Sequence, residues 1–120
     1  DMAVVIAHAA CDIAEELGSA VIAVPTQSGA TARQVSRFRP RRPIVAASPS
    51  PQVLQQLALA WGVVPVGTVD SDSIEALWDM MDHVIRDSGL AGPGDRVVLT
   101  GGTQLNRPGA TDHIVVRVIE

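Results

Sequence analysis

AVIAVPTQSGATARQVS, residues 20–36, joins an apolar run to a helical pattern through a short polar loop. The run at 20–24 predicts a buried strand, and residues 30–38 predict a helix. Between them, Pro25 and Gly29 enclose hydroxyl-bearing residues, so the loop brings hydroxyl groups and a glycine to the N-terminus of the helix. A helix N-terminus presents unpaired backbone N–H groups and a positive dipole end, which attract anions. We therefore predict an anion pocket for phosphate at this loop, with hydroxyls from Thr26, Ser28 and Thr31 and backbone access at Gly29.

Strand and helix patterns alternate along the rest of the chain. Helices are predicted at 3–17, 30–38, 51–61 and 72–88, and strands at 20–24, 44–47, 63–66, 96–100 and 114–119. This alternation predicts one domain over residues 1–120, with a largely parallel sheet in a three-layer α/β/α sandwich. Pro65 marks 63–66 as an edge strand. The last two strands leave no room for a crossover helix, so the last strand is expected to be antiparallel.

Two helices have clear boundary signals. Ser50 is a good N-cap with Pro51 at the first helical position, and the helix that follows is expected to close at Gly62. Its buried face is expected to hold Val53, Leu54, Leu57 and Trp61. The last helix is expected to start at Asp72, with Glu75 completing a capping box and Ser88-Gly89 ending it. Its buried face is expected to hold Ile74, Leu77, Trp78, Met81 and Ile85.

A second loop, GGTQLNRPGATDH at 101–113, is long enough to favour a functional role over a plain connector. Arginine binds phosphate through two hydrogen bonds, and glycine lets the backbone approach a ligand closely. This loop could therefore hold a second anionic group through Arg107, Gly109, Ala110 and Thr111. The alternatives are that Ser28 only caps its helix and that the second loop is an ordinary surface turn.

Composition excludes several classes of function. All nine cationic side chains are arginine, so the chain has neither a P-loop lysine nor a Schiff-base lysine. The net charge of −4 and the aromatic content of 2% argue against a nucleic-acid partner. No run of about 18 apolar residues or signal peptide is present, so no membrane partner is expected. Arg39, Arg41 and Arg42 are interpreted as a solvated edge or an interface patch, not as ligands.

Residues typical of catalysis or metal binding are not grouped. His8, His83 and His113 are scattered, and Asp70 and Asp72 lack the glycine and glutamate of a calcium loop. We predict no catalytic residue, metal site or cofactor in this chain. The single cysteine, Cys11, cannot form an internal disulfide and is expected to be a buried thiol in a cytoplasmic protein. Because an apolar helix follows Asp1 at once, we expect the chain to be a fragment of a longer one.

Several segments together resemble the C-terminal domain of pyruvate kinase. They are EELGS, AVIAVPTQSGATARQVSRFRP, RPIVAASPSPQVLQQLALAWGVVPV, GLAGPGDRVVLTGG and RPGATDHIVVRVI, which follow the family's order over nearly the whole chain. The resemblance implies a five-stranded mixed sheet of order 3-2-1-4-5 with strand 5 antiparallel. In that order strands 1 and 4 are neighbours, so the two loops would meet at the switch point of the sheet.

The resemblance also implies a function. Regulated members of the family bind a phosphorylated effector, a sugar phosphate or a nucleotide, at the position of these loops. By this resemblance, residues 107–111 would close over one end of the effector, and one phosphate would be cradled by Thr26, Gln27, Ser28, Gly29, Ala30 and Thr31. The inserted tryptophan-containing effector loop of the animal enzymes has no counterpart here, which leaves bisphosphate specificity open.

Catalysis in the family belongs to a barrel domain of the same chain, with Mg²⁺ and K⁺, which transfers phosphate from phosphoenolpyruvate to ADP in glycolysis. The resemblance thus implies the allosteric and subunit-interface domain of a homo-oligomeric, tetrameric enzyme, inactive by itself. Two alternatives stay open. One is a stand-alone module that binds a phosphate ligand, and the other is an oligomerisation domain with an empty pocket.

Overall fold

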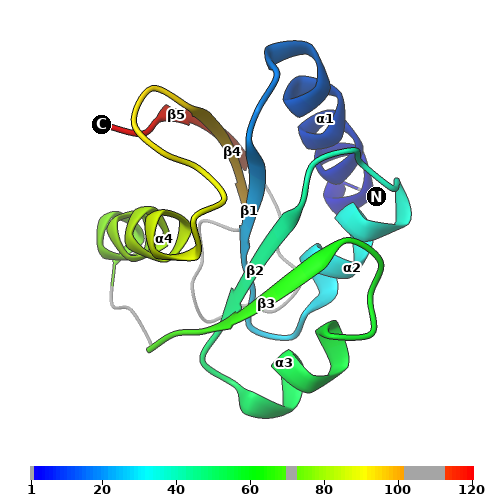
Figure 1. Cartoon of the computed structure of the whole chain (residues 1–120). Coiled ribbons are helices and arrows are strands. Elements are labelled where there is room, and N and C mark those ends of the chain that lie inside the picture. Colours follow the sequence, from blue (N-terminus) through cyan, green and yellow to red (C-terminus); the bar gives the residue numbers. More distant parts are fainter. Residues whose placement is uncertain (1, 70–72, 102–112) are drawn as a thin grey trace.

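The computed structural model describes residues 2–69, 73–101 and 113–120, except for the side chain of Ile74. Helices and strands alternate as predicted, and most boundaries fall within a residue or two of the sequence-based ones (Figure 1). The elements are α1 (Met2–Leu17), β1 (Val21–Pro25), α2 (Ala30–Arg37), β2 (Ile44–Ser48), α3 (Pro51–Leu57), β3 (Val63–Gly67), α4 (Ile74–Ser88), β4 (Arg96–Gly101) and β5 (His113–Val118).

The strands form one sheet in the order β3-β2-β1-β4-β5. Neighbouring strands are parallel except β4 and β5, which are antiparallel. The expected order, the antiparallel last strand and the edge position of the proline-containing strand are therefore confirmed. Pro65 lies opposite Ala46 in β2, on the strand that has only one neighbour.

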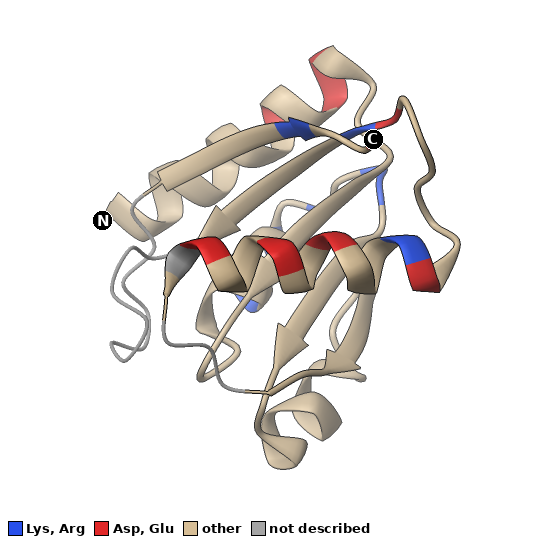
Figure 2. Ribbon diagram, turned by 90° about the vertical axis from the view of Figure 1, so that its left-hand side faces the viewer, with Lys and Arg blue, Asp and Glu red and all other residues tan. Residues whose placement is uncertain are grey.

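Helices cover the two faces of the sheet unequally (Figure 1). The first three helices pack on one face, and α4 crosses the other (Figure 2). Strand residues alternate between the two layers, because successive side chains of a strand point to opposite faces. In β1, Ile22 and Val24 belong to the core under the three helices, and Val21 and Ala23 belong to the core under α4.

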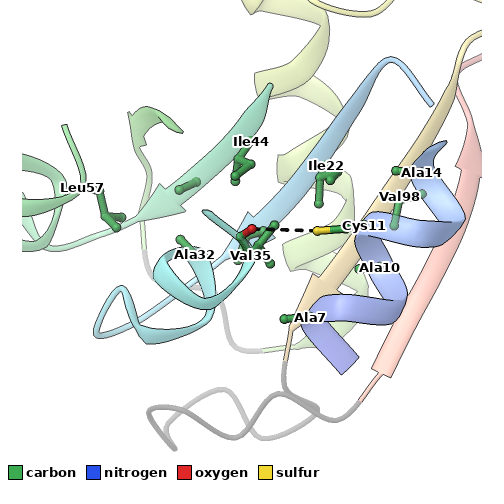
Figure 3. Close-up of a cluster of buried hydrophobic side chains, with 12 residues drawn as sticks. Ala7, Ala10, Cys11, Ala14, Ile22, Ala32, Val35, Ile44, Leu57 and Val98 are labelled. Atoms are coloured by element: carbon green, nitrogen blue, oxygen red, sulfur yellow. Dashed lines mark hydrogen bonds between the residues drawn. The ribbon is translucent and has the colours of Figure 1, made fainter. Parts of the chain in front are cut away.

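Small side chains bring α1 close to the sheet. Ala7, Ala10 and Ala14 are buried in the first core beside Cys11, which is 9% exposed. The Cys11 thiol lies 3.8 Å from the carbonyl oxygen of Val35, to which it donates a weak hydrogen bond (Figure 3). Burial, with a smaller contribution from the neighbouring Asp12 carboxylate, raises the pKa of Cys11 to about 11. The prediction of a buried thiol is confirmed.

The third helix is shorter than predicted, and the prediction that Trp61 is buried is wrong. Helix α3 ends at Leu57, and the side chain of Trp61 is 46% exposed. After Leu57 the N–H groups of Leu59 and Ala60 donate to carbonyls only three residues back. This tighter winding carries Trp61 away from the face that buries Leu57.

The start of α4 also differs from the prediction. The N-cap is Ser73, whose hydroxyl oxygen accepts a hydrogen bond from the N–H of Ala76. Asp72, the predicted cap, lies outside the described residues. The serine is one position nearer the helix and meets an N–H three residues ahead, as an N-cap does. The end of α4 is as expected, with Gly89 in a left-handed conformation.

The other tryptophan is buried as predicted. Trp78 is 8% exposed and packs in the second core with Met81 and Ile85, whereas the neighbouring Leu77 is half-buried.

Across the part of the chain that the structure describes, no helix is both long and apolar enough to cross a membrane.

Candidate functional site

The loop between β1 and α2 is held by its own hydroxyl groups. The N–H of Thr26 donates to the carbonyl of Ala47 in β2 at 2.8 Å, which fixes the start of the loop on the sheet. The side-chain oxygen of Thr26 accepts from the N–H of Gly29 at 2.8 Å, and that of Ser28 accepts from the N–H of Ala30 at 3.3 Å. A hydroxyl that accepts a hydrogen bond still has a hydrogen to donate. Two hydroxyls, those of Thr26 and Ser28, are therefore held in fixed positions beside the first turn of α2.

Gly29 is the N-cap of α2 and, having no side chain, makes no cap hydrogen bond of its own. Its φ of 86° lies in the left-handed region, which L side chains rarely adopt. A Cβ at this position would also lie 3.3 Å from side-chain carbons of Val53 and Leu57. Glycine is therefore required where the loop turns into the helix.

Arg33 is a site residue that the sequence-based prediction missed. Its guanidinium Nη2 donates to the carbonyl of Ser28 at 3.1 Å, so the side chain folds back from the first turn of α2 over the loop. Its Nη1 would lie 2.6 Å from a Cβ on Gly29. The signal available in the sequence was an arginine four residues after the glycine, one helical turn into the helix. The loop therefore has a cationic group beside its hydroxyls.

The predicted residues of this loop differ in exposure. Gln27 is exposed, whereas Thr26, Ser28 and Ala30 are half-buried. Thr31 is only 6% exposed. The first turn of α2 contains no acidic residue that would oppose an anion. Hydroxyl, guanidinium and backbone N–H groups at one place are the chemistry of anion binding, so this loop can bind an anionic ligand.

The carboxyl ends of β1 and β4 lie together at the switch point of the sheet. Gly101 ends β4, and a Cβ on it would lie 3.5 Å from Cγ of Pro25, the last residue of β1. Gly101 also pairs with His113, the first residue of β5. Both residues that flank 102–112 are thus placed near the end of β1. The predicted Arg107, Gly109, Ala110 and Thr111 lie outside the described residues.

Within the described ranges, no three His, Cys, Asp or Glu side chains are grouped as metal ligands would be. Two histidines take part in ring contacts instead. His8 packs on Phe38 with ring centroids 4.8 Å apart, and His113 meets Trp78 edge-on at 5.3 Å.

Comparison with known proteins identifies the family. The sequence model of "Pyruvate kinase, alpha/beta domain" matches residues 5–117. The chain is 40% identical over 115 residues to pyruvate kinase 2 of Synechocystis sp., covering 96% of this chain and 20% of that protein. It is 38% identical over 111 residues to a pyruvate kinase of Agrobacterium vitis, covering 92% of this chain and 23% of the relative.

A pyruvate kinase of Clostridium acetobutylicum is 35% identical over 116 residues, covering 97% of this chain and 24% of the relative. The chain thus spans about a fifth to a quarter of the length of these curated relatives. The matched residues include the whole β1–α2 loop and all five strands except the last residue of β5. The chain belongs to the pyruvate kinase alpha/beta-domain family and corresponds to the C-terminal domain of that enzyme.

Proposed function

We propose that this domain binds a phosphorylated small molecule, a sugar phosphate or a nucleotide, and regulates a pyruvate kinase through it. One phosphate would bind at residues 26–31, on the hydroxyls and the first turn of α2. Residues Arg107, Gly109, Ala110 and Thr111 would close over the other end of the ligand.

The observation that carries this proposal is the geometry of the β1–α2 loop. Thr26 and Ser28 hold their hydroxyls at the N-terminus of α2, and the Arg33 guanidinium lies over the same loop. The loop lies beside the end of β4, at the edge where open α/β sheets bind their ligands. An anion there would accept hydrogen bonds from the two hydroxyls and lie beside the Arg33 guanidinium, at the positive end of the α2 dipole.

Regulation would follow from a difference in affinity. A ligand shifts the balance between two arrangements of subunits only as far as it binds one of them more tightly. The loop touches β2 through Thr26 and the first core through Gly29, so a bound phosphate would stiffen the joint between α2 and the sheet. The helices of this domain would pass that change to neighbouring subunits of a homotetramer.

The activity of the whole enzyme is part of the proposal. Residues 1–120 would be one domain of a longer cytoplasmic polypeptide whose barrel domain transfers phosphate from phosphoenolpyruvate to ADP, with Mg²⁺ and K⁺ bound there. The 120-residue domain alone would be inactive and would need no cofactor of its own.

Calorimetric titration of the chain with a panel of sugar phosphates and nucleotides tests the binding step. Saturable heat with a phosphorylated ligand, and none with its dephosphorylated form, is expected. A chain that gives no heat with any ligand would instead be a purely structural oligomerisation domain. In the enzyme as its gene encodes it, the same ligand is expected to change the half-saturating concentration of phosphoenolpyruvate.

A further inference from the structure

The guanidinium of Arg33 is held against the β1–α2 loop by two features of that loop. Its Nη2 donates to the carbonyl of Ser28 at 3.1 Å. Its Nη1 lies over Gly29, 2.6 Å from the place where a Cβ would be, so the glycine leaves the space that the guanidinium occupies. An exposed arginine normally samples many rotamers, whereas this exposed side chain is fixed at a defined point of the loop.

No carboxylate compensates the charge of Arg33 in the part of the chain that the structure describes. Helix α2, ATARQVSR, contains no acidic residue at all. Arg117, by contrast, pairs with Asp82 at 3.1 Å. A guanidinium has five N–H donors and no acceptor, and the Ser28 carbonyl uses one of them. The remaining donors of Arg33 are those that an anion at the loop would meet.

Ser28 brings two kinds of donor to the same turn of the chain. Its carbonyl accepts from Arg33, and its hydroxyl oxygen accepts from the N–H of Ala30 at 3.3 Å, which leaves the hydroxyl hydrogen to donate. The Thr26 hydroxyl is fixed in the same way by the N–H of Gly29 at 2.8 Å. The loop thus combines one planar, charged set of donors with two neutral hydroxyls.

We propose that Arg33 determines which anion this site accepts, and that it selects a terminal phosphate monoester over a phosphodiester or a carboxylate. The inference rests on the proposed function, which places a phosphate at residues 26–31. The end of the α2 dipole is equivalent to about half a charge, and the hydroxyls are neutral. The guanidinium adds a full charge, so it contributes most to the preference for the more highly charged ligand.

The number of ligand oxygens leads to the same preference. A phosphate monoester has three terminal oxygens, so two can accept from the guanidinium while the third accepts from a hydroxyl of the loop. A phosphodiester and a carboxylate each have two such oxygens and a single negative charge. Either of them can satisfy the guanidinium or the hydroxyls, but not both sets together. The monoester is also a dianion at pH 8, because its second proton dissociates near pH 6.

The test compares methyl phosphate with dimethyl phosphate, which differ in the group in question and carry no other part of an effector. Titration of the 120-residue chain at pH 8 is followed through the amide proton–nitrogen NMR signals of residues 26–31, which report on this loop and on folding together. The wild type is expected to bind methyl phosphate roughly tenfold more tightly than dimethyl phosphate. In Arg33→Gln this ratio is expected to fall to about two or less, mainly through weaker binding of methyl phosphate.

Arg37→Gln is the matched control for the loss of charge. Arg37 is exposed on the same helix, one turn further from the loop, so its substitution is expected to leave the ratio unchanged. If Arg33 only supported the shape of the loop, Arg33→Gln would weaken binding of both probes equally. That result, a wild type without preference between the probes, or an equal loss of preference in Arg37→Gln would each overturn the inference.

The proposed function and the role of Arg33 fail in different ways. If neither methyl phosphate nor any sugar phosphate or nucleotide shifts the signals of residues 26–31 in the wild type, the proposed function fails, and the role of Arg33 with it. If methyl phosphate shifts these signals but the ratio is the same in the wild type and Arg33→Gln, the anion site stands and Arg33 does not select its ligand.

Discussion

Gly101, the last residue of β4, lies directly against Pro25, the last residue of β1, so that a Cβ on the glycine would be 3.5 Å from Cγ of the proline. These two residues end neighbouring parallel strands; α2, which follows β1, packs on one face of the sheet, and α4, which precedes β4, packs on the other. The β1–α2 loop therefore begins beside the carboxyl end of β4.

Replacement of Ser28 by Asp is expected to weaken binding of a phosphorylated ligand roughly tenfold or more. The new carboxylate would lie at the first turn of α2, where its charge would repel the ligand and the hydroxyl that could donate to the ligand would be lost. Calorimetric titration measures the change. Ser50→Asp is the matched control, because the Ser50 hydroxyl also accepts from a backbone N–H at the start of a helix, that of Val53, but is not part of the loop. Equal affinities for Ser28→Asp and wild type would remove the loop from the binding site.

Gly29→Ala is expected to lower the free energy of unfolding by about 2–3 kcal/mol. Part of this cost is the left-handed backbone, and the rest is contact of the new Cβ with Val53 and Leu57 at 3.3 Å. Gly18→Ala is the control, since Gly18 has a φ of 63° and no atom within 4 Å of its Cβ position. Its cost should be backbone strain alone, about 1 kcal/mol. Urea unfolding that gives equal losses would show that the contacts at Gly29 contribute nothing.

Ser73→Ala is expected to destabilise the protein by about 1 kcal/mol, because the N–H of Ala76 loses the hydroxyl that accepts its hydrogen bond. Ser73→Asp should retain most of the stability, since a carboxylate accepts the same hydrogen bond. Thermal unfolding compares the two variants. An unchanged midpoint for Ser73→Ala, with a lower one for Asp72→Ala, would return the cap to the position expected from the sequence.

The stability of the protein is expected to fall between pH 9 and 11 because of Cys11. Burial raises the pKa of this thiol from 9.0 to about 11, so in this range the unfolded chain loses a proton that the folded chain keeps. The resulting stabilisation is complete below pH 9 and is lost as the pH rises through 11, up to about 2–3 kcal/mol in total.

The composition of the chain leaves few other groups that could contribute to the pH dependence between pH 9 and 11. It contains no lysine or tyrosine, so Cys11 is the only side chain expected to titrate in this window. Urea unfolding at pH 8, 9, 10 and 11 measures the slope, and Cys11→Ala should remove it. A slope that persists in Cys11→Ala would assign the effect to another group.

Periodicity and turn residues were sufficient to predict the elements and the antiparallel last strand. They could not predict that β1 and β4 are neighbours, because pairing between residues 76 positions apart, such as Val21 and Val97, leaves no local signal. The adjacency of β1 and β4 was predicted only from the resemblance to a family. In the proposed function, this adjacency lets the two loops contribute to one binding site.

The wrong predictions for α3 and for the start of α4, and the failure to predict Arg33, have local causes. The apolar spacing from Val53 to Trp61 fits a helix, but the chain tightens after Leu57, and the Trp61 carbonyl accepts a hydrogen bond from Ser36 instead. Asp72 and Ser73 are both good caps, and a shift of one residue is invisible to a capping pattern. Arg33 was missed because its role depends on a side-chain fold toward Ser28 that spacing does not encode.

The two tryptophans have opposite environments, Trp78 at 8% exposure in the core and Trp61 at 46% on the surface. The emission spectrum of the native protein should therefore be a sum of a blue-shifted and a red-shifted component, of which iodide quenches only the second. Each component reports on a different face of the sheet, α4 for one and the turn after α3 for the other. Without any attached dye, the molecule carries separate optical reporters for loosening of its interior and for events at its surface.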